Sequence, residues 1–347
     1  MNLLPEHRAL QHERAPRPLP LFLELVRRTA ENEPEVARQA LAGLHAYARA
    51  ERRAPPPARA EAARVGPAAL RDHSGSGPLA VLVPSLINPP SVLDLDEQVS
   101  LAAAIGRMGR RALLLDWGEA AGRADLTVAG HVESLLLPLL AELGEPAALI
   151  GYCLGGTMAI AAANLATVER VATLAAPWHF ANYPADSRAT LAAIWRQAAG
   201  AAQAVGALPM EVLQAAFWSI DPQRTVAKFA QFAALDPQSA RARRFVALED
   251  WANEGEPLPL PAARELIEDL FGADLPARGR WSVGGQVMSD KLNVPTLHFT
   301  AAQDRIAPAA SAPAGEKIDV ASGHVGMIVG RRADEQLHRP LARWLAS

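Results

Sequence analysis

The 347-residue chain contains one cysteine, Cys153, which lies in the segment Gly-Tyr-Cys-Leu-Gly-Gly at residues 151–156. A short apolar run ends just before it, and an Ala-rich run with helical spacing follows it. The pattern Gly-x-Cys-x-Gly-Gly between a strand and a helix is typical of a nucleophile elbow, whose glycines let the two backbones pass close to the nucleophile. Cys153 would then lie at a helix N-terminus, whose positive end favours a thiolate. The residue types therefore predict nucleophilic catalysis by a thiol.

A free cysteine is usually a small buried apolar side chain, so this prediction depends on partners elsewhere in the chain. Asp304 follows the predicted strand at residues 294–300, and His324 follows the predicted strand at residues 317–320. The order Cys153, Asp304, His324 is the nucleophile–acid–histidine order of α/β-hydrolases. Asp304 would orient His324, and His324 would deprotonate Cys153 and then move protons to and from the acyl acceptor.

Two other residues compete for these roles. His179 follows the predicted strand that ends at Pro177, and it is the alternative base. Asp116 follows an earlier predicted strand and is the rival acid, but the order of elements favours Asp304 and leaves Asp116 a structural or substrate-positioning role. Asp304 could instead be a helix N-cap, which is the usual role of an aspartate after a strand.

An oxyanion hole requires two N–H donors beside the nucleophile. The first expected donor is the backbone N–H of Leu154, the residue after Cys153. The second is expected from the loop after the first core strand, from Leu86 or Ile87.

Short apolar runs separated by helical segments must position these residues. The runs at residues 79–84, 111–117, 147–152 and 171–177 predict buried strands, and residues 294–300 and 317–320 continue the series. Strands that alternate with helices indicate a doubly wound, mostly parallel sheet of the α/β class.

The alternation stops at residue 178 and resumes at residue 293. Residues 178–292 are therefore expected to be a mainly helical cap inserted into the core, which comprises residues 76–177 and 293–347. Twelve of the 18 aromatic residues lie between Trp178 and Trp281, either as the core of the helices themselves or as an apolar lid that restricts water at an acyl site. Residues 1–75 are expected to be an N-terminal helical arm and linker, with a stiff Pro-rich stretch at residues 53–59.

Composition excludes several other classes of function. A net charge of −3 argues against a nucleic-acid partner. A single cysteine excludes an intramolecular disulfide and a Cys-rich zinc site, and we expect no metal. The apolar runs are too short to span a membrane, and residues 1–8 lack the apolar core of a signal peptide. With one unpaired thiol, the protein is expected to be cytoplasmic.

Over residues 79–347 the chain resembles the polyhydroxyalkanoate synthases, and it is most similar to the short synthases that work with a second subunit. The matching motifs are the cysteine box at residues 151–156, Val-Pro-Ser-Leu-Ile-Asn at 83–88 with Leu-Asp-Leu at 93–95, Asp-Trp-Gly at 116–118, Asp-Arg-Ile at 304–306 and Ser-Gly-His at 322–324. The chain departs from the family pattern at Ser91, His179 and Arg305.

The resemblance implies the α/β-hydrolase fold and the polymerisation of (R)-3-hydroxyacyl-CoA through an acyl group on Cys153. It implies no cofactor, since the coenzyme A thioester is the substrate, and it implies Asn88, Asp116 and Trp117 as substrate-binding residues. The implied partners are the growing polyester and either a second copy of the chain or a second synthase subunit. The implied location is the surface of polyester granules in the cytoplasm.

Cysteine suits this chemistry for an independent reason. A thiol that attacks a thioester forms another thioester, so the acyl group stays activated for transfer to a hydroxyl. Two alternatives share the same motifs. One is a cysteine thioesterase or polyester hydrolase on the same scaffold, and the other is a granule-associated paralogue with an inert triad.

Overall fold

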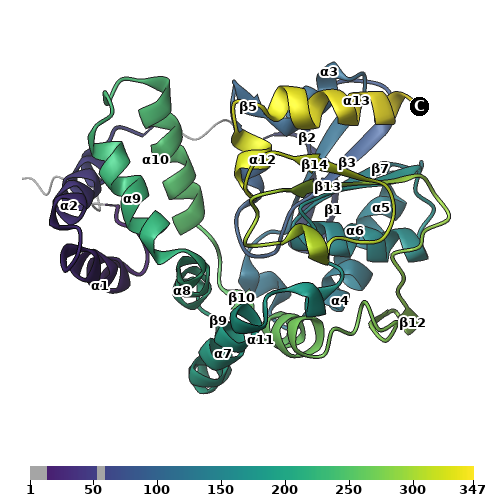
Figure 1. Ribbon diagram of the computed structural model, residues 1–347. Helices are drawn as coiled ribbons and strands as arrows, with labels where there is room; N and C mark the ends of the chain where they lie inside the picture. Colours follow the sequence, from purple (N-terminus) through teal and green to yellow (C-terminus); the bar gives the residue numbers. More distant parts are fainter. Residues whose placement is uncertain (1–13, 53–58) are drawn as a thin grey trace, which may run out of the picture. The chain divides into compact units, whose positions relative to one another are not determined.

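The computed structural model describes residues 14–52 and 59–347 (Figure 1). The chain divides into two compact units. Of the described residues, the helical unit comprises 14–52 and 217–253, and the α/β unit comprises 59–216 and 254–347. The N-terminal residues 1–8 and most of the expected Pro-rich linker at 53–59 lie outside the described residues.

In its described part, the α/β unit contains an eight-stranded sheet with the order β1-β2-β6-β3-β7-β8-β13-β14. Strand β2 is antiparallel to both its neighbours, and the pairs from β6 to β14 are parallel. This is a doubly wound, mostly parallel sheet, so the predicted α/β fold class is confirmed. The strands are β1 (Glu61–Val65), β2 (Ala68–Ser74), β3 (Leu79–Val83), β6 (Arg111–Asp116), β7 (Ala148–Tyr152), β8 (Arg170–Leu174), β13 (Thr296–Ala301) and β14 (Lys317–Val320).

The central strands are continuous apolar runs because helices cover both faces of the sheet. All residues of β3 and β7 are buried. Helices α3 (Leu101–Arg107) and α13 (Arg339–Ala346) lie on one face, and α5 (Leu137–Glu142) and α6 (Leu154–Leu165) lie on the other (Figure 1). Helix α3 begins where the Ser100 hydroxyl accepts a hydrogen bond from the N–H of Ala103, as an N-cap does.

Strands β1 and β2 occupy residues that the sequence analysis placed in the N-terminal arm and linker. They are rich in alanine and arginine, which have little preference for strands. These two strands are therefore stabilised by pairing with neighbouring strands, for example where Leu70 of β2 is paired with Leu115 of β6. A tight turn joins β1 to β2 at Gly66, whose φ is 54°.

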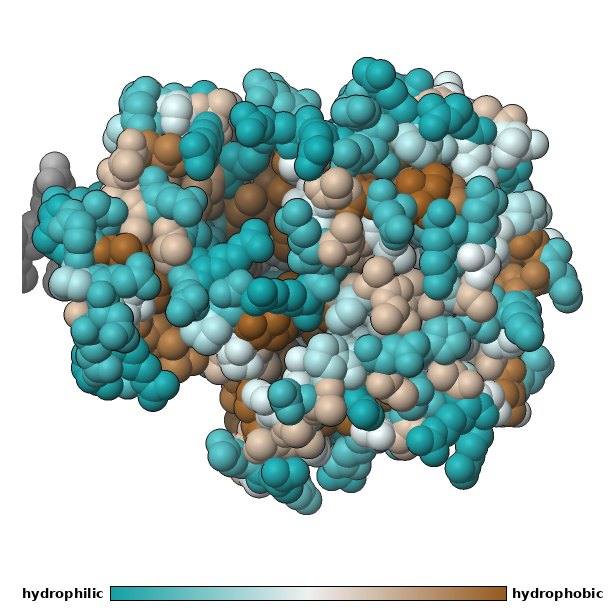
Figure 2. Space-filling view, viewed as in Figure 1, coloured by the Kyte–Doolittle hydropathy of each residue, from teal (hydrophilic) through white to brown (hydrophobic). Residues whose placement is uncertain are grey.

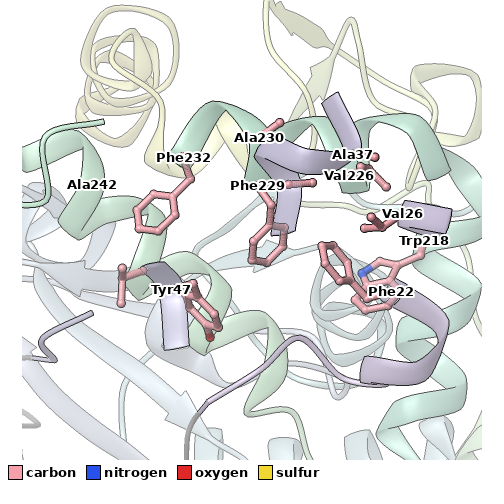
Figure 3. Packing of buried hydrophobic residues seen from close by; sticks show 12 residues of the cluster. Phe22, Val26, Ala37, Tyr47, Trp218, Val226, Phe229, Ala230, Phe232 and Ala242 are labelled. Atoms are coloured by element: carbon pink, nitrogen blue, oxygen red, sulfur yellow. The ribbon is translucent and has the colours of Figure 1, made fainter. Parts of the chain in front are cut away.

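The helical unit joins the N-terminal arm to the middle of the insertion in one apolar core (Figure 3). Phe22 packs edge-on against Phe229 with ring centroids 4.7 Å apart, and against Trp218 at 6.1 Å. The expected arm and cap therefore do not form separate bodies: parts of both share this core. The helices are α1 (Leu19–Ala30), α2 (Pro34–Arg49), the last turn of α8 (Met210–Ile220), α9 (Pro222–Ala233) and α10 (Ala240–Asn253).

A buried polar network ties the same two segments together. The Tyr47 hydroxyl donates to Asp250 Oδ1 at 2.6 Å, and Arg52 Nε donates to Asp250 Oδ2 at 3.1 Å. The backbone N–H of Arg17 donates to Asn253 Oδ1 at 3.0 Å. Because buried polar groups must be paired, these bonds specify how the arm packs on α10.

The rest of the insertion belongs to the α/β unit. In the described part of the chain it adds no strand to the main sheet and forms only short two-stranded ladders. Trp281 is anchored there by a 2.7 Å hydrogen bond from its Nε1 to the buried Glu265. The elements are α7 (Ala185–Val205), β9 (Ala207–Leu208), β10 (Leu258–Pro259), α11 (Leu260–Arg264), β11 (Ser282–Val283) and β12 (Gln286–Val287). Elsewhere in the unit lie β4 (Asp94–Asp96), β5 (Val99–Ser100), α4 (Val128–His131) and α12 (Gly326–Val329).

Hydrophilic side chains cover most of the face seen in Figure 2, with smaller apolar areas among them. The most exposed large apolar side chains of the described residues are those of Leu23, Leu41, Val205 and Val287. Scattered exposed apolar side chains are normal on folded proteins and mark no site by themselves. None of the described helices is both long and apolar enough to cross a membrane.

Candidate active site

Cys153 lies in a sharp turn between β7 and α6. Its φ is 56°, a left-handed conformation that residues other than glycine rarely adopt and that often occurs at functional sites. A Cβ at Gly151 would come within 2.4 Å of the Gly156 Cα, and one at Gly155 within 2.1 Å of the Val83 carbonyl oxygen. These close approaches require the glycines of the Gly-x-Cys-x-Gly-Gly pattern.

His324 and Asp304 form a buried pair at the edge of the sheet. The Nδ1 atom of His324 lies 2.7 Å from Asp304 Oδ2. Asp304 follows β13 and His324 follows β14, and these neighbouring parallel strands pair Ala301 with Val320 at their ends. Nδ1 of His324 donates this hydrogen bond, because a carboxylate can only accept it. The other ring nitrogen, Nε2, is then the one that can exchange a proton with Cys153.

The charges around His324 favour its protonated form. Burial lowers the pKa of His324, but the negative charges of Cys153 and Asp304, with hydrogen bonds to both, raise it to about 10. The structure thus brings the cysteine, the histidine and the acid together. An imidazolium between a thiolate and a carboxylate is the arrangement that a cysteine nucleophile uses.

This environment predicts a pH dependence of stability. A raised pKa means that the imidazolium stabilises the native state fully below the ordinary value of 6.5, and that this contribution is lost as the pH rises through about 10. Asp304→Asn removes one of the two negative charges and should lower the pKa of His324. We therefore expect wild type and variant to differ more in free energy of unfolding at pH 6 than at pH 10, as measured by denaturant titration. A constant difference across this range would contradict the assigned charges.

Two buried tyrosines near this pair were not predicted from the sequence. The ring of Tyr152 lies 5.1 Å from the ring of His324, and its hydroxyl donates to the His324 carbonyl oxygen at 3.5 Å. Burial and then the charge of Cys153 hold the pKa of both Tyr152 and Tyr183 well above the usual range. Tyr152 could have been noticed as the neighbour of the cysteine, whereas nothing near Tyr183 in the sequence marks it.

The two competing residues are paired elsewhere. His179 Nε2 lies 3.2 Å from Asp290 Oδ2, and its backbone N–H donates to the Ser311 carbonyl oxygen at 2.9 Å. Asp116 accepts a hydrogen bond from the N–H of Gly118 at 3.0 Å, so its carboxylate holds a local turn. The carboxylate partner of His324 is Asp304.

The loop after β3 lies against the start of α6. Gly155 allows this approach, since a Cβ there would also meet the carbonyl oxygen of Pro84 at 2.5 Å. Leu154 is the first residue of α6, so its N–H lacks a carbonyl partner in the helix. The Ile87 N–H donates to the Ser85 hydroxyl at 3.3 Å, which leaves the Leu86 N–H as the better candidate for the second oxyanion donor.

The expected substrate-binding residues have different surroundings. Trp117 is buried, and its Nε1 donates to the Pro84 carbonyl oxygen at 3.1 Å, so it supports the backbone of the loop after β3. Asn88 is half-buried in that loop. In the described residues no group of three or more His, Cys, Asp or Glu side chains is arranged to hold a metal ion.

The chain is similar to curated poly(3-hydroxyalkanoate) polymerase subunits, although no family model matches it. It is 26% identical over 290 residues to the subunit of Haloferax mediterranei, and 25% identical over 294 residues to that of Synechocystis sp.. The matches cover 77% and 78% of this chain, and 58% and 78% of the two relatives, so the chain spans little more than half the length of the first. They confirm the resemblance that the motifs indicated.

Solved structures with a similar fold include hydrolases. The chain is 14% identical to an esterase from Thermogutta terrifontis, with a TM-score of 0.49 over 84% of this chain and 98% of the esterase. It is 16% identical to a monoacylglycerol lipase from Paleococcus ferrophilus, with a TM-score of 0.49 over 80% of this chain and 98% of the lipase.

Proposed function

We propose that the protein is an acyltransferase of the polyhydroxyalkanoate synthase type, which polymerises 3-hydroxyacyl-CoA through an acyl group on Cys153. The buried 2.7 Å pair of His324 and Asp304 beside the cysteine elbow is the observation that carries the proposal. The similarity to polymerase subunits supports the substrate class.

Acylation is the first half of the proposed reaction. In the resting enzyme the proton of Cys153 lies on Nε2 of His324, and the Cys153 thiolate attacks the thioester carbonyl carbon of the acyl-CoA. The N–H groups of Leu154 and Leu86 stabilise the oxyanion that forms. The bond from carbon to the coenzyme A sulfur then breaks, and the imidazolium returns its proton to the leaving thiolate.

Transfer is the second half. The terminal hydroxyl of another acyl unit gives its proton to His324 as its oxygen attacks the acyl group on Cys153. The carbon–sulfur bond breaks, the thiolate of Cys153 is restored beside the imidazolium, and the chain is one ester longer. Asp304 keeps the proton on Nδ1 of His324 throughout, so that Nε2 alone exchanges protons. Every proton step uses residues of this chain, and we propose that no cofactor beyond the thioester substrate is needed.

The partners are proposed on the same basis. Both relatives are described as subunits, so we expect this chain to act with a second copy or with a second kind of subunit. We further propose that the enzyme works in the cytoplasm at the surface of its polyester product.

Product analysis tests this function. Purified protein incubated with 3-hydroxybutyryl-CoA is expected to release CoA and to leave an ester-linked oligomer or polymer, with or without an added second subunit. Intact-protein mass spectrometry should find a 3-hydroxybutyryl adduct on wild type and none on Cys153→Ala, because the thiol is the proposed point of attachment.

Two outcomes would contradict the polymerase proposal. Free 3-hydroxybutyrate equal in amount to the released CoA, with no oligomer even after a second subunit is added, would identify a cysteine thioesterase. No CoA release and no adduct under any of these conditions would identify an inert paralogue.

A further inference from the structure

Gly255 is a buried glycine in the return segment, residues 254–257, which follows α10 and leads into β10. The return segment belongs to the α/β unit. Gly255 does not have the left-handed backbone conformation that favours glycine. A glycine at this position is therefore explained by the space around it and not by its backbone.

The return segment packs directly on the loop after β3. A Cβ at Gly255 would lie 2.8 Å from the Ile87 carbonyl oxygen and 2.6 Å from Sδ of the buried Met210, closer than real Cβ atoms come to other atoms. The sulfur ends a flexible side chain and can give way. The Ile87 oxygen is a backbone atom, so a side chain at position 255 has to displace the loop itself.

The loop after β3, residues 84–88, is also held at its other end. The Pro84 carbonyl oxygen accepts from Trp117 Nε1 at 3.1 Å, and it lies so close to α6 that only glycine fits at position 155. The loop is thus fixed beside the cysteine elbow at its start and against the return segment at Ile87. Leu86, the candidate for the second oxyanion donor, lies between these two fixed points.

Glu256 connects the return segment to a second loop. Its carboxylate accepts a hydrogen bond from the N–H of Ala120, which begins a 3₁₀ turn at residues 120–123. The first residue of such a turn has no carbonyl partner for its N–H within the turn, so the carboxylate supplies one. Strand β10 packs against the same turn. This is the loop that begins with Trp117, so Glu256 supports indirectly what Gly255 contacts directly.

We propose that Gly255 and Glu256 are positioning residues, which hold the loop after β3 in place for its part in the oxyanion hole. The N–H of Leu86 then stays directed at the oxyanion that forms when Cys153 is acylated. The inference rests on the proposed function in one respect, the acylation of this thiol. It assigns to the return segment of the insertion a role in stabilising the transition state, separate from the proton transfer at His324.

Two reactions of the same thiol distinguish these roles. Iodoacetamide alkylates Cys153 by displacement at a saturated carbon, which forms no oxyanion and depends on the thiolate alone. With p-nitrophenyl acetate, the thiolate attacks the carbonyl carbon and forms a tetrahedral oxyanion. The carbon–oxygen bond to the leaving group then breaks, p-nitrophenolate departs, and acetyl remains on sulfur. An oxyanion hole therefore accelerates the second reaction and leaves the first unchanged.

Gly255→Ala should separate the two rates. The new methyl group displaces the Ile87 carbonyl, so we expect the rate of acylation by p-nitrophenyl acetate to fall about tenfold. Alkylation by iodoacetamide at pH 7 should stay as in wild type. In acyl transfer, kcat should fall with KM nearly unchanged, because the oxyanion exists only after the attack. Acylation is followed as p-nitrophenolate release, with Cys153→Ala as the blank.

The chain offers a matched glycine as a control. A Cβ at Gly200, in helix α7 of the same insertion, would meet nothing within 4 Å. Gly200→Ala should therefore leave both reactions as in wild type. A double variant controls for the second contact of the new methyl group. Met210→Ala removes the sulfur atom but not the Ile87 oxygen, so Gly255→Ala should slow acylation as much in the Met210→Ala background as in wild type.

Glu256 tests the same role without a group added at position 255. Glu256→Ala removes the acceptor of the Ala120 N–H, and we expect acylation to fall about fivefold with alkylation unchanged. Glu256→Gln keeps an oxygen that can accept this bond and should restore acylation to nearly the wild-type rate. This pair decides the inference even where Gly255→Ala does not fold.

Several results would overturn the inference. They are wild-type acylation in both Gly255→Ala and Glu256→Ala, an equal fall of acylation and alkylation in Glu256→Ala, or recovery of Gly255→Ala on removal of the Met210 sulfur. An absence of Cys153-dependent acylation in wild type would also overturn it. Neither reaction uses a CoA thioester or measures polymer. A failure of this inference is therefore distinguishable from a failure of the proposed function, which product analysis decides.

Discussion

Cys153→Ala should abolish acyl transfer, with CoA release from 3-hydroxybutyryl-CoA falling by roughly 10,000-fold or more. The thiol is the group that would carry the acyl chain, and alanine offers no replacement nucleophile. The fold should survive, because alanine keeps the Cβ atom and meets the same φ of 56° that cysteine meets in the elbow. Rates of CoA release at saturating substrate provide the measurement, and an unchanged melting temperature is the control.

Alkylation gives an independent check on the same residue. Because the chain has one cysteine, iodoacetamide incorporation counts this site alone. Wild type should incorporate one label per chain at neutral pH, faster than an ordinary exposed thiol, and lose activity in proportion. Full activity in Cys153→Ala, or in the labelled enzyme, would show that the nucleophile lies elsewhere.

His324→Gln should lower kcat by several orders of magnitude, roughly 10,000-fold, because no other group at the elbow takes the thiol proton. Asp304→Asn should cost as much or less. An amide at that position can donate to Nδ1, which would leave the imidazole in the wrong tautomer for accepting a proton at Nε2. Steady-state kinetics of the two single variants and the double variant would measure these losses, and the losses should not be additive if the residues act as a unit.

His179→Gln is the matched control for the histidine. Its Nε2 atom pairs with Asp290 at 3.2 Å, so the substitution should reduce the rate only mildly. If this variant were the severely impaired one and His324→Gln were nearly normal, His179 would be the base and the assignments would have to be exchanged.

The parts of the fold that the sequence predicts are those whose local pattern is dictated by burial. Strands β3 and β7 are continuous apolar runs because both their faces are covered, and any such run between turns indicates a central strand. Strands β1 and β2 carry no such pattern, since their stability comes from pairing at the edge of the sheet. The spacing of apolar residues by itself therefore predicts a linker where the structure has β1 and β2.

Long-range contacts explain what the sequence does not predict about the site. The elbow around Cys153 is local, and its glycines are visible in six residues. The contact between His179 and Asp290 joins residues more than 100 positions apart. No pattern of spacing encodes such a pair in a single sequence, so the competing base could be resolved only in three dimensions.

The two-part origin of the helical unit has a consequence for synthesis of the chain. Helices α1 and α2 leave the ribosome before α9 and α10, which complete their core and follow after about 170 further residues. At about 5–20 residues per second this delay is roughly 9–34 s. During that time Phe22, Val26 and Tyr47 have no core to enter, so the nascent hairpin presents an apolar face on which chaperones or neighbouring nascent chains can act. The helical unit therefore cannot fold vectorially from its N-terminus, and its assembly has to wait for the middle of the polypeptide.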